Sequence, residues 1–294
     1  MGKTFLVLGA KGQLGRDFCE ALQAQGLPFL GLDRPEVDIT DPVSIETRTS
    51  SWVSSSLKEG HSLVVLNCAA YTDVEKAETE RDLCRAVNVI GAGHVARWAR
   101  RWNGSVVYFS TDFVFDGQKG APYVETDPPR PLSYYGLSKW EGEEETRRCC
   151  PQHFLLRLAW LYGEHGNHFI GKIAEQAQKN PERRVVDDQW GSPTWTVDVV
   201  RQTLALVNTD HHGLFHAVNT GGVSRRDLAA RALDLLGIPC RVIGCKSDEF
   251  PQKAVRPPSS ELKNEGLDRL GLNLMPPWPD ALARFCDVYK RRFL

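Results

Sequence analysis

Apolar and polar positions follow two different periods along the first half of the chain. Short apolar runs alternate with longer stretches in which apolar residues recur every three or four positions. The runs predict buried strands and the stretches predict amphipathic helices. We expect strands at 4–9, 28–32, 62–67, 105–110 and 153–158, and helices at 13–25, 42–57, 79–101 and 134–148. This alternation predicts an α/β fold, with a doubly wound parallel sheet covered by helices on both faces.

The pattern loosens after residue 163. Helices are predicted at 169–178, 197–207, 224–236 and 280–291, and strands at 184–186 and 214–218. The strand at 214–218 is expected to rejoin the first sheet, which would return residues 190–220 to the N-terminal domain. We therefore expect a large domain at 1–157 and a smaller lobe at 158–294 that is not continuous in sequence.

Composition excludes several classes of function. The chain has 294 residues and a net charge of −1, which gives no electrostatic footprint for nucleic acid or an anionic membrane. No apolar run approaches the roughly 20 residues that span a bilayer, and the N-terminus lacks a signal-peptide pattern. The 8 cysteines are scattered without zinc-type spacing. We expect free thiols, no metal, no membrane partner, no nucleic-acid partner and a cytoplasmic location.

The turn after the first predicted strand is rich in glycine. It reads Gly9-Ala10-Lys11-Gly12-Gln13-Leu14-Gly15. Glycines at this spacing let the backbone turn sharply and let a pyrophosphate approach the amides of a helix N-terminus. A strand, a glycine turn and a helix in this order are typical of a dinucleotide site. The alternative is a tight turn that binds no ligand.

The end of the second strand bears on which dinucleotide binds. The carboxylate of Asp33 favours NADH, because it can hydrogen-bond the adenosine ribose hydroxyls. Arg34 and Lys11 lie close enough in sequence to pair with the 2′-phosphate of NADPH instead. The sequence therefore leaves the cofactor as NADPH or NADH.

Groups suited to acid–base chemistry follow the fourth strand. Thr111 ends this strand, and Tyr135 and Lys139 are four residues apart, on one face of the helix at 134–148. An ammonium near a phenol favours the phenolate, so we expect Lys139 to lower the pKa of Tyr135 and make it a general acid. Because ligands bind at the carboxyl ends of parallel strands, the three groups should converge on one carbonyl oxygen. A Tyr-x-x-x-Lys pair alone also occurs on solvated helices.

Two further residues carry open alternatives. Arg256 is a candidate for a substrate diphosphate, since a guanidinium matches phosphate geometry with two donors, but it could also be solvated. Asn88 is either an exposed polar residue or one that steers a backbone carbonyl near the site.

Taken together, these residues resemble the extended short-chain dehydrogenase/reductase superfamily. Within it, the chain is most similar to the dTDP-4-dehydrorhamnose reductases, the RmlD-like sugar-nucleotide reductases. The similar segments cover essentially the whole chain in one order: 9–15, 67–78, 110–117, 134–143, 157–163, 188–195 and 256–262.

The resemblance implies a Rossmann-type NAD(P)-binding domain, a substrate-binding lobe and the reduction of dTDP-4-dehydro-L-rhamnose at C4 by NADPH or NADH. It implies that Tyr135 is the general acid, that Lys139 holds the nicotinamide ribose and that Thr111 hydrogen-bonds the sugar carbonyl. Asp112 and Trp160 would contact the substrate. The residues around the dinucleotide would be Gly12, Gln13, Leu14, Asp33, Asp38, Ile39, Ala69, Ala70 and Tyr71.

The chain departs from the family pattern near the expected sugar pocket. Phe113 stands where tyrosine is familiar, and Leu158-Ala159 replaces a Thr-Ser pair. One alternative is therefore a reductase of another dTDP-4-keto-6-deoxy sugar. Another is a non-catalytic regulatory subunit resembling the beta subunit of methionine adenosyltransferase. We expect a homodimer, but the glutamates of magnesium-bridged family dimers have no match here.

Overall fold

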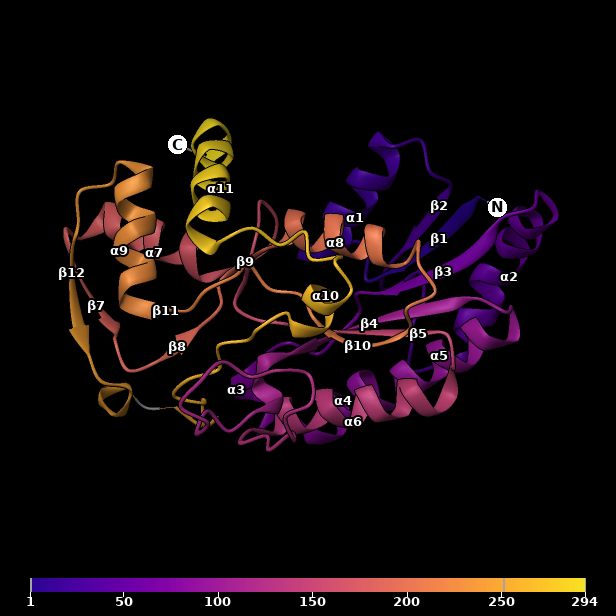
Figure 1. The fold of residues 1–294 in the computed structure, drawn as a ribbon, viewed down its shortest axis with the longest axis horizontal. Helices are drawn as coiled ribbons and strands as arrows, with labels where there is room; N and C mark the ends of the chain where they lie inside the picture. Colours follow the sequence, from indigo (N-terminus) through magenta and orange to yellow (C-terminus); the bar gives the residue numbers. More distant parts are fainter. Residues whose placement is uncertain (1, 251, 294) are drawn as a thin grey trace.

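A central parallel sheet organises the molecule. The computed structural model describes residues 2–250 and 252–293. Six strands lie in the order β10-β5-β4-β3-β1-β2, and each neighbouring pair is parallel. The strands are β1 Lys3–Leu8, β2 Phe29–Leu32, β3 Ser62–Asn67, β4 Ser105–Thr111, β5 His153–Leu158 and β10 Gly213–His216. The doubly wound α/β fold predicted from the alternation is confirmed, and β10 lies at the sheet edge beside β5 (Figure 1).

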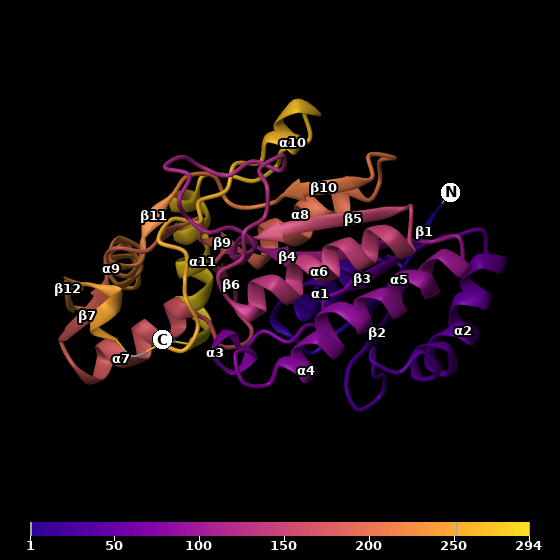
Figure 2. The ribbon, with the colours of Figure 1, turned by 90° about the horizontal axis from the view of Figure 1, so that it is seen from below.

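Helices cover both faces of this sheet (Figures 1 and 2). On one face, α1 Gln13–Ala24 packs beside α8 Thr196–Leu206 over a shared apolar core. The other face carries α2 Pro42–Lys58, α5 Ala92–Arg101 and α6 Tyr134–Cys149. The order of connection reverses between β1 and β3, so their carboxyl ends flank the crevice where doubly wound sheets bind ligands.

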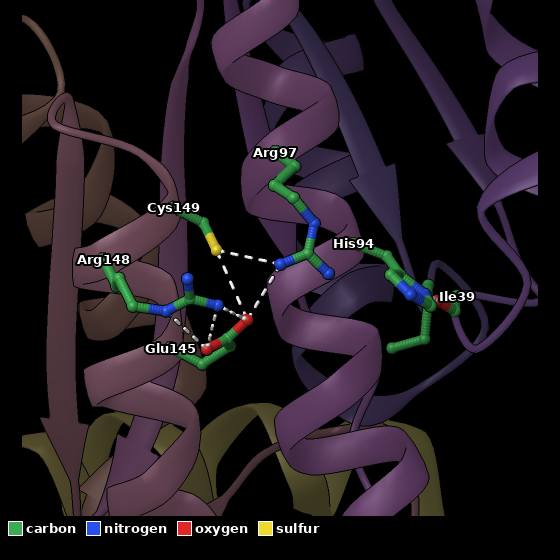
Figure 3. A network of polar contacts seen from close by, with 6 residues as sticks. All are labelled: Ile39, His94, Arg97, Glu145, Arg148 and Cys149. Carbon is green, nitrogen blue, oxygen red and sulfur yellow. Dashed lines mark hydrogen bonds and ion pairs between the residues drawn. The ribbon is translucent and has the colours of Figure 1, made fainter.

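Polar contacts fix α6, the helix that carries Tyr135 and Lys139, against α5 (Figure 3). Arg97 on α5 donates to Glu145 on α6 at 2.8 Å, and Arg148 donates to the same carboxylate at 2.7 Å. On the far side of α5, His94 Nδ1 lies 3.2 Å from the carbonyl oxygen of Ile39. Helix α5 therefore connects the proposed catalytic helix to the segment that follows β2.

The second half of the chain adds a lobe with its own apolar core (Figure 1, left). Helices α7 Phe169–Lys179, α9 Arg225–Leu236 and α11 Trp278–Phe293 surround this core. Strand β7 Glu182–Val186 pairs in parallel with β12 Arg241–Cys245, a strand that the sequence did not predict. The short elements are β6 Leu161–Tyr162, β8 Trp190–Gly191, β9 Thr194–Trp195, β11 Val223–Ser224, α3 Val74–Ala77, α10 Glu265–Arg269, and the 3-10 helices η2 Asp112–Val114 and η3 Ser247–Glu249.

The long helix predicted at 79–101 is interrupted. The structure has α4 Arg81–Arg85, a π-helical segment Ala86–Gly91, and then α5. Asn88 lies in the π segment and is buried, with its amide bonded to the backbone N–H of Tyr71 at 2.9 Å and to Ser138 Oγ at 2.9 Å. The wider turn brings this side chain inward, and such turns are frequent at functional sites. No helix in the described ranges is long and apolar enough to cross a membrane.

Candidate active site

The glycine turn after β1 forms a tight cradle. Gly9 has a φ of +79°, and a Cβ atom there would lie 2.6 Å from the backbone nitrogen of Ala69. A Cβ atom on Gly15 would lie 2.1 Å from the carbonyl oxygen of Gly9. Gly12 caps α1 without a side-chain hydrogen bond, so the amides of the first helical turn remain available to an anion.

Two adjoining cavities follow the carboxyl ends of β1, β3 and β4. The first has a volume of about 290 Å³, and its lining includes Gly9, Asp33, Arg34, Ile39, Ala69 and Tyr71. The second has a volume of about 420 Å³, and its lining includes Gln13, Leu14, Thr111, Asp112, Tyr135, Lys139 and Trp160. Gly12, Cys68 and Ala70 line both. The shared wall makes one elongated trough.

The residues of this trough fit a dinucleotide. Two residues of its lining each have a buried polar atom, Gln13 Nε2 and Asn67 Oδ1, without a hydrogen-bond partner within the described residues. Buried polar atoms are nearly always satisfied, so an unpaired donor and an unpaired acceptor on one cavity wall indicate a polar ligand. The glycine cradle and the amides of the first turn of α1 suit a pyrophosphate, with one nucleoside in each cavity.

The adenosine end of the trough carries a fixed carboxylate. Asp33 accepts hydrogen bonds from the backbone N–H of Lys11 at 2.8 Å and of Arg34 at 2.7 Å. Both nearby cations are engaged elsewhere: Lys11 pairs with Glu36 at 3.1 Å and Arg34 with Asp38 at 2.7 Å. Three of the predicted cofactor contacts, Lys11, Gly15 and Asp38, are not in the lining of either cavity.

The predicted catalytic side chains meet in the second cavity. Thr111 ends β4, and its hydroxyl donates to Asp112 Oδ1 at 3.0 Å. Tyr135 lies in the first turn of α6, which begins at the N-cap Ser133, and its ring contacts Phe113 edge-on with ring centres 5.8 Å apart. Asp112 is buried and also accepts from Ser260 Oγ at 2.5 Å.

Burial governs the protonation of these groups. It raises the pKa of Tyr135 above the ordinary phenol value, against the opposing effect of the Thr111 hydroxyl. It lowers the pKa of Lys139 to about 7, although Glu143 acts to raise it. It also raises the pKa of Asp112 to about 6, against the hydrogen bonds from Ser260 and Thr111. The pKa of Tyr135 is therefore raised and not lowered as the sequence led us to expect, because desolvation of the phenol is the largest effect on it.

A buried ionic network behind the site was not found from the sequence. Glu143 lies one turn after Lys139 and accepts from Arg157 Nε at 2.9 Å and Nη2 at 2.7 Å. It also accepts from Ser110 Oγ at 2.5 Å. The network joins α6 to β4 and β5. In the sequence, Glu143 looks like an exposed helical residue. The apolar neighbours of Arg157 are the one signal that could have indicated the burial of Arg157 and its need for a partner.

A further cavity of about 590 Å³ adjoins the second across Trp160, which lines both. Arg256 lies in this cavity with Arg225, Arg184 and Lys172. Arg256 is not solvated freely, because its guanidinium pairs with Glu75 at 2.7 Å and also bonds Gln252. All four predicted substrate residues thus line the second or third cavity.

The expectation that the protein binds no metal stays a prediction. Within the described ranges, the ligand atoms of Asp17, Glu20 and His165 lie within 4.8 Å of one another. His165 Nε2 lies 2.9 Å from Glu20 and 3.7 Å from Asp17, so contacts within the group account for its geometry.

Comparison with known proteins agrees with this geometry. The family model of the RmlD substrate binding domain matches residues 3–291. The chain is 37% identical over 286 residues to dTDP-4-dehydrorhamnose reductase of Streptomyces griseus, covering 95% of this chain and 91% of that protein. It is 35% identical to dTDP-4-keto-6-deoxy-D-glucose reductase of Streptomyces niveus, covering 97% and 96%. The crystal structure of Bacillus anthracis dTDP-4-dehydrorhamnose reductase in complex with NADP is 33% identical, with a TM-score of 0.89, covering 97% and 99%.

Proposed function

The chain belongs to the RmlD substrate binding domain family, and from that premise we propose that it reduces dTDP-4-dehydro-L-rhamnose to dTDP-L-rhamnose with NADPH or NADH. One observation carries this proposal. Thr111 at the end of β4 and the pair Tyr135 and Lys139 on α6 line one cavity, which adjoins the glycine turn. That arrangement suits a carbonyl reduction in which proton donors surround the oxygen.

The residues act on the charge that develops on the C4 oxygen. When bound, the reduced nicotinamide supplies the hydride for C4. Because burial raises its pKa, Tyr135 stays protonated at neutral pH and can donate its proton to the oxygen. The Thr111 hydroxyl can rotate from Asp112 towards the cavity and donate a second hydrogen bond. The Lys139 ammonium then stabilises the phenolate that Tyr135 becomes.

In this proposal the two halves of the chain bind different ligands. The sheet domain, residues 1–157 with the return of 190–220, holds the dinucleotide in the trough. The lobe within 158–294 holds the sugar nucleotide in the basic cavity on the other side of Trp160. Trp160 and Asp112 then bound the sugar, which lies between these two sites.

A panel of keto sugars tests the proposal. Purified protein is assayed with dTDP-4-dehydro-L-rhamnose and with dTDP-4-dehydro-6-deoxy-D-glucose, each with NADH and NADPH, by loss of nicotinamide absorbance. Tyr135→Phe should lower kcat by about 10²–10⁴-fold while leaving the NADH Kd unchanged. Tyr134→Phe is the matched control, because Tyr134 is outside the lining of this cavity. Near wild-type turnover by Tyr135→Phe would refute the assignment.

A second candidate substrate has its own support. The relative from Streptomyces niveus is named for dTDP-4-keto-6-deoxy-D-glucose, at almost the same identity as the rhamnose reductases. Preferential turnover of that sugar in the same panel would favour this reading. The homodimer and the cytoplasmic location stay predictions, and light scattering of the purified protein checks the first.

A further inference from the structure

The basic cavity has an unusual charge balance. Its charged lining residues are Lys172, Arg184, Arg225 and Arg256, and none of its lining residues within the described ranges is a carboxylate. The cavity adjoins the one that holds the catalytic groups, and Trp160, Leu161 and Asn167 line both. A cationic hollow at this position suits an anionic part of a ligand whose other end reaches Tyr135.

The four cations differ in how far their charge is already neutralised. Arg184 pairs with Glu249, and Arg256 pairs with Glu75 at 2.7 Å. Lys172 is exposed to solvent. Arg225 is partly buried, and its guanidinium has no hydrogen bond or carboxylate partner within the described residues.

Arg225 is held by aromatic rings instead. Its guanidinium carbon lies 3.5 Å from the ring centre of Trp160 and 5.2 Å from that of Phe169. These contacts fix the plane of the guanidinium and leave its N–H groups without protein acceptors. The Asp112 carboxylate acts to raise its pKa, but no ion pair between the two side chains is present.

Its position in the chain is unfavourable for a cation. Arg225 is the first residue of α9, directly after the N-cap Ser224, where the helix dipole disfavours positive charge. Burial also lowers its pKa to about 9, and nearby Arg256 acts in the same direction. Binding of an anion to the guanidinium would relieve both penalties.

Trp160, the partner of Arg225, is itself constrained. It has a φ of +45°, in the left-handed region that a non-glycine residue rarely adopts. A Cβ atom on Gly191 would lie 2.4 Å from the indole, so the ring rests against bare backbone there. The stack of Arg225 on Trp160 therefore helps to set the wall between the two cavities.

We propose that Arg225 binds the diphosphate of the nucleotide-sugar substrate and, through its stack on Trp160, positions the sugar at the catalytic cavity. A guanidinium binds phosphate oxygens with two parallel donors, which a lone ammonium cannot do. The proposal rests on the proposed function for the identity of the sugar, but it concerns a binding event that needs no turnover.

Titration calorimetry with dTDP tests this directly. Arg225→Gln should raise the dTDP Kd by about tenfold or more, because the bidentate charge is lost. The neighbouring Arg226→Gln is the matched control: Arg226 is exposed and pairs with Asp227 at 2.8 Å, so its variant should bind dTDP as the wild type does. Arg225→Lys should fall between the two, since it keeps the charge without the stack. All variants should bind NADH with unchanged Kd, which also shows that each is folded.

Kinetics separate binding from structure. With the keto sugar, Arg225→Gln should raise KM by a factor similar to the Kd change and alter kcat less. Wild-type affinity for dTDP in Arg225→Gln, or no dTDP binding by the wild type, would overturn the proposal. Failure of the wild type to reduce any keto sugar, with dTDP binding that depends on Arg225, would refute the proposed reaction and leave this site standing.

Discussion

At the residue scale, burial sets the charge of the groups that face the site. The pKa of Lys139 is about 7, far below the ordinary lysine value of 10.5, because its ammonium is desolvated. The group is therefore charged below about pH 7 and neutral above it. Tyr135 shifts in the direction that keeps it protonated. Tyr135 therefore keeps its proton over a wide pH range, whereas Lys139 loses its charge near neutral pH.

This difference predicts the pH profile. The value of kcat/KM for NADH, which reports the free enzyme, should fall as the pH rises through about 7, because the Lys139 ammonium is lost. Glu143→Gln should move this fall to lower pH, since the Glu143 carboxylate raises the pKa of Lys139. Initial rates across pH provide the measurement. A profile that stays flat well above neutral pH would contradict the role given to Lys139.

The fixed position of the Asp33 carboxylate predicts which of the two cofactors binds more tightly. NADH should bind more tightly than NADPH by about tenfold or more, because the fixed carboxylate repels a 2′-phosphate while Lys11 is occupied by Glu36. Glu36→Gln releases Lys11 and should narrow the difference by improving NADPH binding. Fluorescence titration of both cofactors measures this. Equal affinities in the wild type would show that the ion pairs open freely.

At the scale of elements, one buried ionic network fixes α6, β4 and β5 relative to one another. Glu143 on α6 bonds Ser110 on β4 and Arg157 on β5, and all three side chains are buried. Thr111 follows Ser110, and Lys139 lies one turn from Glu143. The network therefore fixes the strand end and the helix face that together form the catalytic cavity.

Removing one partner of the ion pair between Glu143 and Arg157 should destabilise the protein. Arg157→Met leaves the Glu143 carboxylate buried without its partner and should lower the free energy of unfolding by about 3–5 kcal/mol. The double variant Glu143→Gln/Arg157→Met removes both charges and should lose clearly less. Urea denaturation of the three proteins measures the difference. Equal losses in the single and double variants would mean that the charge itself is not what destabilises.

At the scale of the whole molecule, two apolar cores support the two sides of the site. One lies between the sheet and the helices α1 and α8, and the other lies within the lobe among α7, α9 and α11. Trp160 contacts the lobe core while it lines the catalytic cavity. The sugar site therefore depends on both cores, whereas the cavity expected to hold the adenosine is lined by residues between Gly9 and Val87.

A variant of Phe285 tests whether the dinucleotide site is independent of the lobe core. It is fully buried in the lobe core, between Tyr162 and Tyr289. Phe285→Ala should lower the free energy of unfolding by about 3–5 kcal/mol through the cavity that it leaves. The NADH Kd should change little, because Trp160 is the one described residue of the trough lining that packs against this core. Denaturation and cofactor titration are measured on the same sample, and a large loss of NADH affinity would contradict this independence.

The sequence determined the elements whose determinants are local. Continuous apolar runs fixed the strands of the central sheet, because a strand buried on both faces needs apolar residues at every position. The turn from Gly9 to Gly15 was also legible, since only glycine allows such close backbone approaches. Strand β12 was missed because Arg241–Cys245 is a partly exposed strand in a two-stranded sheet, where no continuous apolar run is needed.

Only the tertiary structure decided which polar residues are buried and which are paired. A lone arginine at a helix start looks solvated in sequence, and nothing local distinguishes Arg225, stacked on Trp160, from Arg226 on the surface. The direction of the Tyr135 pKa shift also depended on how much of the fold covers the phenol. Pairing and desolvation are set by segments far apart in the chain, so they appear only once the chain has folded.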